Sequence, residues 1–197
     1  MLIEQGSVPA AALPVSQFRD HLRLGTGFSD DTVQDGLLET CLRAALAAIE
    51  QRTGKALIAR GFSLSLTAWR DNRCQPIPVA PVQSIDVFSV VDRAGTATAV
   101  AATSYRLIAH LNQPHIEALG TVLPVIPSGG AAELLLTAGY GAAWTDVPPD
   151  LQRAVLMLSA SFYERRHDTG SSGDGLPAAV LALIAPYRAL RLTAGAF

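Results

Sequence analysis

The stretch Leu57-Ile-Ala-Arg-Gly-Phe-Ser-Leu-Ser-Leu-Thr67 decides the fold, because the spacing of apolar residues changes within it from helical to alternating. Phe62, Leu64 and Leu66 alternate with small hydroxyl residues, and this period of two predicts a strand with one buried face. Before this stretch, an apolar stripe at helical spacing predicts a long helix that Gly54 ends. The chain therefore passes from helical to β structure at about residue 57.

Residues beyond this stretch continue the β structure and then return to helices. Four later segments rich in β-forming residues are expected to be strands: 84–91, 105–109, 115–119 and 133–138. Pro148 and Pro149 suit the first turn of a helix that runs to about Arg166, and Pro177 opens a last helix that Pro186 ends or kinks. A short helix is also expected after Pro14.

Together these elements predict an α+β protein that is mainly α, with a small helical bundle formed by both chain ends around an inserted β region. The expected parts are an N-terminal arm (1–13), a helical core (14–56 and 145–187), a β-rich insertion (57–144) and a C-terminal tail (188–197).

The composition favours a protein that associates with copies of itself. Apolar residues make up 49% of the chain and charged residues only 16%, so the surface carries few charges. Such a surface leaves apolar groups that association buries. No segment is apolar over the length that a membrane-spanning helix needs, and no signal peptide precedes the first helix, so we expect neither a membrane nor a secretory location.

The charge pattern argues against tight binding of nucleic acid. The net charge is −2, and the cations are 14 arginines and the single Lys55, scattered along the chain. Arg165 and Arg166 form the only adjacent pair. Tight binding to DNA needs clustered cations that neutralise phosphates. We therefore expect DNA to contact the protein weakly, if it does so at all.

Several motifs that resemble chemical sites are incomplete, so we expect no metal, no cofactor and no catalytic residue. His110 and His115 lack a full set of zinc ligands, and Thr53-Gly-Lys55 lacks the earlier glycine of a phosphate-binding loop. Cys41 and Cys74 are too few for a disulfide framework, and Cys41 falls on the apolar face of the long helix. A hydrolase with a spatially assembled site is retained as a minor alternative.

Four residues are candidates for a subunit interface or a channel lining. Arg165 and Arg166 lie in a charged cluster at a helix end, which is either a solvated terminus or an interface. Trp144 and Tyr140 are aromatic residues of a type found both in cores and as interface anchors.

The order of the segments resembles the head–tail connector (adaptor) family of tailed double-stranded DNA phages and gene transfer agents. The segments that carry the resemblance are 14–24, 44–58, Pro78-Val-Ala-Pro-Val-Gln-Ser-Ile85, Thr137-Ala-Gly-Tyr-Gly141, Val147-Pro-Pro-Asp-Leu151 with its helix to Arg165, and Leu183-Ile-Ala-Pro-Tyr-Arg188. They span about residues 14–190.

This resemblance implies a structural protein without catalytic residues. Adaptors of this family form a ring, typically of twelve copies, which lies beneath the portal protein, extends the DNA channel and docks a stopper or other tail-side protein. The implied location is the virion, at the head–tail interface, with assembly in the host cytoplasm. The resemblance also implies that the C-terminal segment reaches the portal, and the residues in the matching place are Tyr187, Arg188, Leu190, Arg191, Leu192 and Phe197.

Two other structural or binding roles stay open at this stage. A tail-terminator or stopper subunit is the closest alternative, although the helical flanks argue against a purely β stopper. A DNA-binding regulator is the other, and a salt-dependent gel shift would reveal it.

Overall fold

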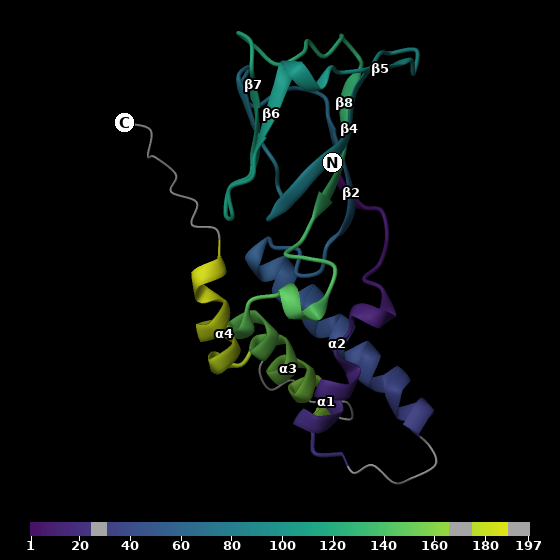
Figure 1. The fold of residues 1–197 in the computed structure, drawn as a ribbon, viewed down its shortest axis with the longest axis vertical. Helices are drawn as coiled ribbons and strands as arrows, with labels where there is room; N and C mark the ends of the chain where they lie inside the picture. The colour runs from purple at the N-terminus through teal and green to yellow at the C-terminus, as the bar shows by residue number, and fades with distance from the viewer. Residues whose placement is uncertain (25–30, 166–174, 189–197) are drawn as a thin grey trace. The chain divides into compact units, whose positions relative to one another are not determined.

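The computed structural model describes residues 1–24, 31–165 and 175–188. The chain forms two compact units, each built from two separate segments (Figure 1). The β unit comprises Met1–Val8 and Lys55–Ala143, and the helical unit comprises Pro9–Gly54 and Trp144–Phe197.

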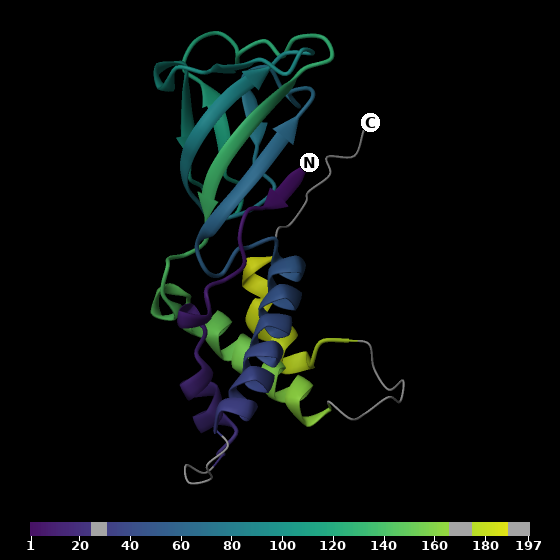
Figure 2. The same ribbon diagram turned by 90° about the vertical axis from the view of Figure 1, so that its right-hand side faces the viewer.

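Two antiparallel sheets make up the β unit (Figure 2). The larger sheet has the strand order β1-β2-β8-β4-β5, and its strands are β1 (Leu2–Glu4), β2 (Arg60–Leu66), β8 (Ala131–Ala138), β4 (Val82–Val91) and β5 (Ala97–Ala99). The smaller sheet has the order β3-β7-β6, with β3 (Cys74–Pro76), β7 (His115–Ala118) and β6 (Tyr105–Ile108). A short 3-10 helix, η2 (Ala102–Ser104), precedes β6.

One hydrophobic core joins the two sheets. Alternate residues of the larger sheet point inward, as the period of two in the sequence predicts, and Phe62, Leu64 and Leu134 are almost fully buried. Ile116 of β7 belongs to the same core from the smaller sheet. Burial of each such side chain stabilises the fold by about 1.5–3 kcal/mol, so this core holds the sheets together.

A chain of three aromatic rings bridges the sheets at one side of the core. Phe88 of β4 lies edge-on to Trp69, with centroids 5.9 Å apart, and edge-on to Tyr105 of β6, with centroids 5.0 Å apart. The Trp69 Nε1 group donates a hydrogen bond of 2.7 Å to the Pro124 carbonyl. These contacts fix the loop that contains Pro124 to the core.

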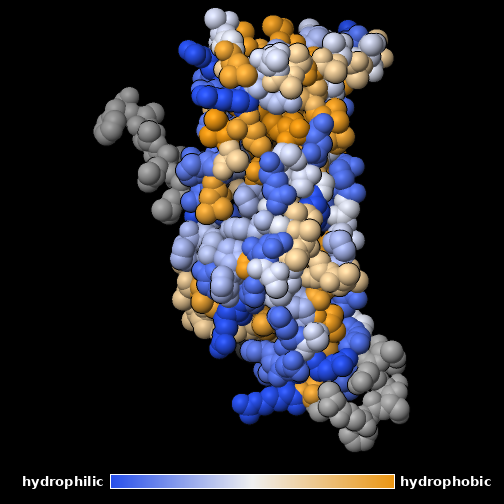
Figure 3. Space-filling view, viewed as in Figure 1, coloured by the Kyte–Doolittle hydropathy of each residue, from blue (hydrophilic) through white to orange (hydrophobic). Residues whose placement is uncertain are grey.

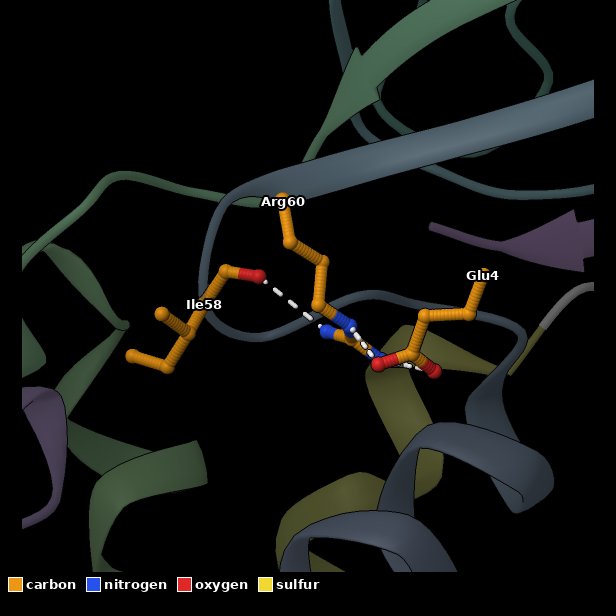
Figure 4. A network of polar contacts seen from close by, with 3 residues as sticks. All are labelled: Glu4, Ile58 and Arg60. Atoms are coloured by element: carbon orange, nitrogen blue, oxygen red, sulfur yellow. Dashed lines mark hydrogen bonds and ion pairs between the residues drawn. The ribbon is translucent and has the colours of Figure 1, made fainter. Parts of the chain in front are cut away.

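Edge strand β1 is fastened by an ion pair (Figure 4). The guanidinium of Arg60 donates to both carboxylate oxygens of Glu4, at 2.7 and 3.3 Å, and to the Ile58 carbonyl at 3.1 Å. The same guanidinium lies 5.0 Å from the centroid of the Phe62 ring. Arg60 therefore covers the apolar core with its side chain and holds β1 in register with β2.

Four α-helices form the core of the helical unit. They are α1 (Val15–His21), α2 (Asp31–Thr53), α3 (Pro149–Glu164) and α4 (Ala178–Ile184), and the 3-10 helices η1 (Ala10–Ala12), η3 (Trp144–Asp146) and η4 (Ala185–Tyr187) accompany them. Helix α3 contacts α1, α2 and α4, so it is the central helix of the unit. Its apolar face buries Leu151, Val155 and Leu158 against the other helices.

The local predictions for the long elements are confirmed. Strands β2, β4, β6, β7 and β8 and helices α2 and α3 lie within one to three residues of the expected positions. Cys41 is buried on α2, and neither it nor Cys74 forms a disulfide.

The expected fold class, α+β but mainly α, is wrong. About 36% of the described residues are helical and 27% are strand, and these residues form four α-helices against eight strands. The difference arises from short strands that carry no periodic signal. Residues 2–4, expected to be part of an arm, form β1, while β3 and β5 have only three residues each.

Gly139 permits a close approach of two chain segments at the end of β8. Its φ is +139°, and its amide donates to the Pro81 carbonyl at 2.9 Å. A Cβ atom at this position would lie 2.4 Å from both the N and the Cα of Ala59. Only glycine fits here, because the obstacle is backbone.

We expect Gly139→Ala to lower the free energy of unfolding by roughly 3 kcal/mol or more, since the backbone of Ala59 must move to admit the methyl group. Chemical denaturation measures this loss. Gly120→Ala is the matched control, because no atom lies within 4 Å of the position that its added methyl group would take, and it should leave stability nearly unchanged. Equal stability of the two variants would contradict this account.

Candidate interaction surfaces

The residues expected to bind the portal begin at the end of the helical unit. The Tyr187 hydroxyl donates a hydrogen bond of 2.7 Å to Asp150 Oδ1, which ties η4 to the first turn of α3. Arg188 follows and is exposed. The other four residues of this set lie outside the described residues: Leu190, Arg191, Leu192 and Phe197.

The four residues expected at a subunit interface or channel lie in different surroundings. Arg165 is exposed after α3, where its guanidinium donates to Ser161, and Arg166 lies outside the described residues. Trp144 is buried in the helical unit, and its Nε1 donates to Gln17 Oε1 at 2.9 Å. Tyr140 is half-buried in the β unit, just after β8. The structure thus assigns Arg165 to the surface and Trp144 to packing within its own unit.

His110 and His115, the two histidines considered as zinc ligands, lie at one turn of the β unit and contact its backbone. His110 Nδ1 accepts hydrogen bonds from the amides of Asn112 and Gln113, at 3.2 and 3.3 Å, and His115 Nδ1 lies 3.1 Å from the Gln113 carbonyl. Within the described part of the chain, no group of three or more His, Cys, Asp or Glu side chains is placed to hold a metal ion. The histidines here shape a loop.

Lys55 holds the same loop from inside the β unit. The side chain is buried, and Nζ donates to the Leu111 carbonyl and, at 2.7 Å, to Asn112 Oδ1. Burial lowers the pKa of Lys55 below its ordinary value. Gly54 before it has φ +68° and its amide closes the last turn of α2, so Thr53-Gly-Lys55 is a helix end followed by a structural lysine.

A row of apolar side chains crosses the outer face of the larger sheet. Ile3 of β1 pairs with Ser63 of β2, Ser63 with Leu135 of β8, and Leu135 with Val87 of β4. The exposed fractions of Ile3, Leu135 and Val87 are 46%, 42% and 46%. Since neighbouring strands lie about 4.8 Å apart, this sheet-face row spans roughly 14 Å.

A second apolar surface lies beside the other edge of the same sheet. An open groove of about 430 Å³ runs along β5, and its lining includes Val90, Thr98, Val100, Pro124, Val125 and Pro127. Val125 stands at its rim with 81% of its surface exposed, and it directly follows the buried Leu123 and Pro124, whose carbonyl accepts the Trp69 hydrogen bond. We call this surface the loop groove. Figure 3 shows hydrophobic residues gathered in a band across the β unit on the face drawn there.

Sequence reasoning missed both apolar surfaces. The row joins residues from four strands, so it can be recognised only when the register of these strands is known. One signal was present, because Leu134-Leu135-Leu136 places three leucines in succession and a strand cannot bury all three on one face. The loop groove has no comparable signal.

Comparison with solved structures identifies relatives over nearly the whole chain. The chain is 51% identical to a chain in the neck of an empty gene transfer agent (GTA) particle in C6 symmetry, with a TM-score of 0.91, and the match covers 99% of this chain and 98% of that one. The virion of a native GTA particle contains a match at 51% identity and a TM-score of 0.87, with the same coverage. The neck of a native GTA particle in C12 symmetry gives 48% identity and a TM-score of 0.85, again with the same coverage.

The chain belongs to the family of GTA neck proteins. No family model matches it, and no curated protein matches it. The structures that it resembles are structural parts of a particle, which supports a structural role for this neck protein. The predicted location in the virion, at the neck, is confirmed by these matches. Among the described residues of the neck protein, no helix has the length and hydropathy to cross a membrane.

We expect Lys55→Met to lower the free energy of unfolding of the neck protein by roughly 1–2 kcal/mol at neutral pH, because Leu111 and Asn112 lose their donor. The folded chain holds Lys55 at a pKa below the ordinary value of 10.5. Between these two values the unfolded chain binds more protons, so the stability of the wild type rises with pH relative to the variant.

Thermal denaturation of both proteins, at pH values from neutral to above 10, tests this expectation. The stability gap between wild type and variant should widen as the pH rises. A gap that is constant with pH, or a variant as stable as the wild type, would contradict the role of Lys55.

Proposed function

We propose that this neck protein is the adaptor, a ring-forming subunit that connects the portal to the tail-side proteins and extends the DNA channel. The observation that carries the proposal is the 51% identity to a GTA neck chain over nearly the full length of both chains. The C6 and C12 symmetry of the neck structures supports a closed ring of identical subunits, with twelve copies as the proposed number.

The ion pairs of four arginines support a channel through which DNA slides. Arg19, Arg43, Arg60 and Arg106 each form an ion pair with a carboxylate, and their partners are Asp35, Glu39, Glu4 and Glu117. A guanidinium that is already paired with a carboxylate attracts a phosphate less strongly. Each phosphate contact that is lost lowers the affinity for DNA and makes that affinity less dependent on salt. The proposed ring therefore guides DNA without holding it. Arg165, with Arg166, remains our candidate for the channel or the subunit interface.

The end of the helical unit supports a portal contact through the C-terminal segment. The bond from Tyr187 to Asp150 fixes the point from which residues 188–197 continue. Arg188 is already exposed at that point, so a partner can reach it. We propose that Tyr187 anchors this segment and that the apolar and cationic residues after it bind the portal.

Reconstitution with the portal tests the adaptor assignment. Mixed with purified portal protein and analysed by size exclusion with light scattering, the full chain should form a complex with twelve copies per portal ring. A variant that lacks residues 193–197 should keep the circular dichroism spectrum and melting temperature of the wild type but lose the complex.

Two results would contradict two different parts of the proposal. A full chain that never co-elutes with the portal, or that binds only tail-side proteins, would exclude the adaptor role and favour a stopper or tail terminator. A truncated chain that still docks would exclude the C-terminal segment as the contact.

A further inference from the structure

Within the described part of the chain, the β unit carries nearly all of the large apolar side chains that are exposed. Among the described residues, nine large hydrophobic side chains are exposed, and Leu37 of α2 is the one that lies in the helical unit. The others include the sheet-face row and the rim of the loop groove. Exposed apolar groups that gather in this way mark a surface that another molecule covers.

The two apolar surfaces lie at different places on one sheet, since the row crosses its outer face from β1 to β4 and the groove lies beside β5. The sheet-face row begins at edge strand β1, and the loop groove runs beside edge strand β5 at the other end of the strand order. A cyclic ring of identical subunits is built from a head-to-tail contact, which requires two different surfaces on each copy. A sheet with one apolar surface across its outer face and another beside edge strand β5 supplies such a pair.

We propose that the sheet-face row of one copy packs against the loop groove rim of the next copy, with Val125 seated between Ile3 and Leu135. This inference rests on the proposed ring and names the surfaces that form it. The occupant of each surface is a second copy of this chain.

The shapes of the two surfaces are complementary. Ser63 has a small side chain and lies between Ile3 and Leu135 in the row, so the row has a dip at its position. Val125 is a branched side chain that projects from a loop held by Leu123 and by the Trp69 hydrogen bond. Such a rigid aliphatic group loses little conformational freedom when it enters a dip of this size.

The charges beside the two surfaces are also complementary. Glu133 lies two residues before Leu135 on β8, on the same outer face, and is exposed. Arg93 is exposed next to the loop groove, where its side chain lies against Gly129. Neither side chain forms an ion pair with any described residue of its own copy, so an Arg93–Glu133 contact between copies is open to both. Unlike charges on the two sides favour one orientation of docking.

Cysteine cross-linking in assembled particles tests the proposal. The variant is Ser63→Cys with Val125→Cys in a Cys74→Ser background, which leaves only the buried Cys41 as a native thiol. After treatment with a short bismaleimide, denaturing electrophoresis should show a ladder of covalent dimers, trimers and larger multiples of this chain. Each single-cysteine variant should give no ladder, because a head-to-tail chain of links needs both sites.

The matched control is Leu111→Cys with Val125→Cys in the same background. Leu111 is 48% exposed, at least as accessible as the residues of the row, but it lies on the loop held by Lys55 between β6 and β7 of the smaller sheet. The control should give no ladder.

A double variant that enters the particles yet stays monomeric, a ladder in the control, or a cross-link from Ser63→Cys to a protein of another mass would overturn the proposed interface. A failure of the adaptor role would give a different result, because the chain would then be absent from the neck or from the portal complex.

Discussion

Strand β8 is the constraint on which the β unit depends, because both β2 and β4 pair with it along most of their length. Leu134 and Leu136 of β8 are fully buried in the core between the sheets. The period of two then forces Leu135 onto the outer face, where it is exposed. An apolar residue held outward by the central strand cannot be hidden by any local rearrangement, since a register shift would turn the core outward as well.

This constraint connects the fold to the role of the protein. The ion pair of Arg60 with Glu4 keeps β1 in register, and that register brings Ile3 into line with Leu135 and Val87. The result is a continuous row of exposed apolar side chains on a unit that is otherwise well packed. In a monomer such a surface is a liability, whereas in a member of the GTA neck family it suits a subunit that has permanent neighbours.

The sequence predicts the long elements of this fold but underestimates the share of residues in strands. The alternation of Phe62, Leu64 and Leu66 predicts β2, and the apolar stripe before Gly54 predicts α2, since both signals are local and periodic. Strands β1, β3 and β5 are too short to show a period and are defined by pairing with distant residues, so the β content was underestimated. The candidate surfaces were harder to predict than these elements. Tyr187 was singled out by resemblance, and its bond to Asp150 became visible only in three dimensions. The sheet-face row depends on the register of four strands, which one sequence does not specify beyond the hint of three successive leucines in β8.

A three-dimensional reconstruction of the neck of the particle that contains this chain is the most direct test of the account. We predict a closed ring in which Leu135 of each copy is buried beneath Val125 of the adjacent copy. A chain placed outside the neck, or a neck ring in which Leu135 faces solvent or a different protein, would contradict it.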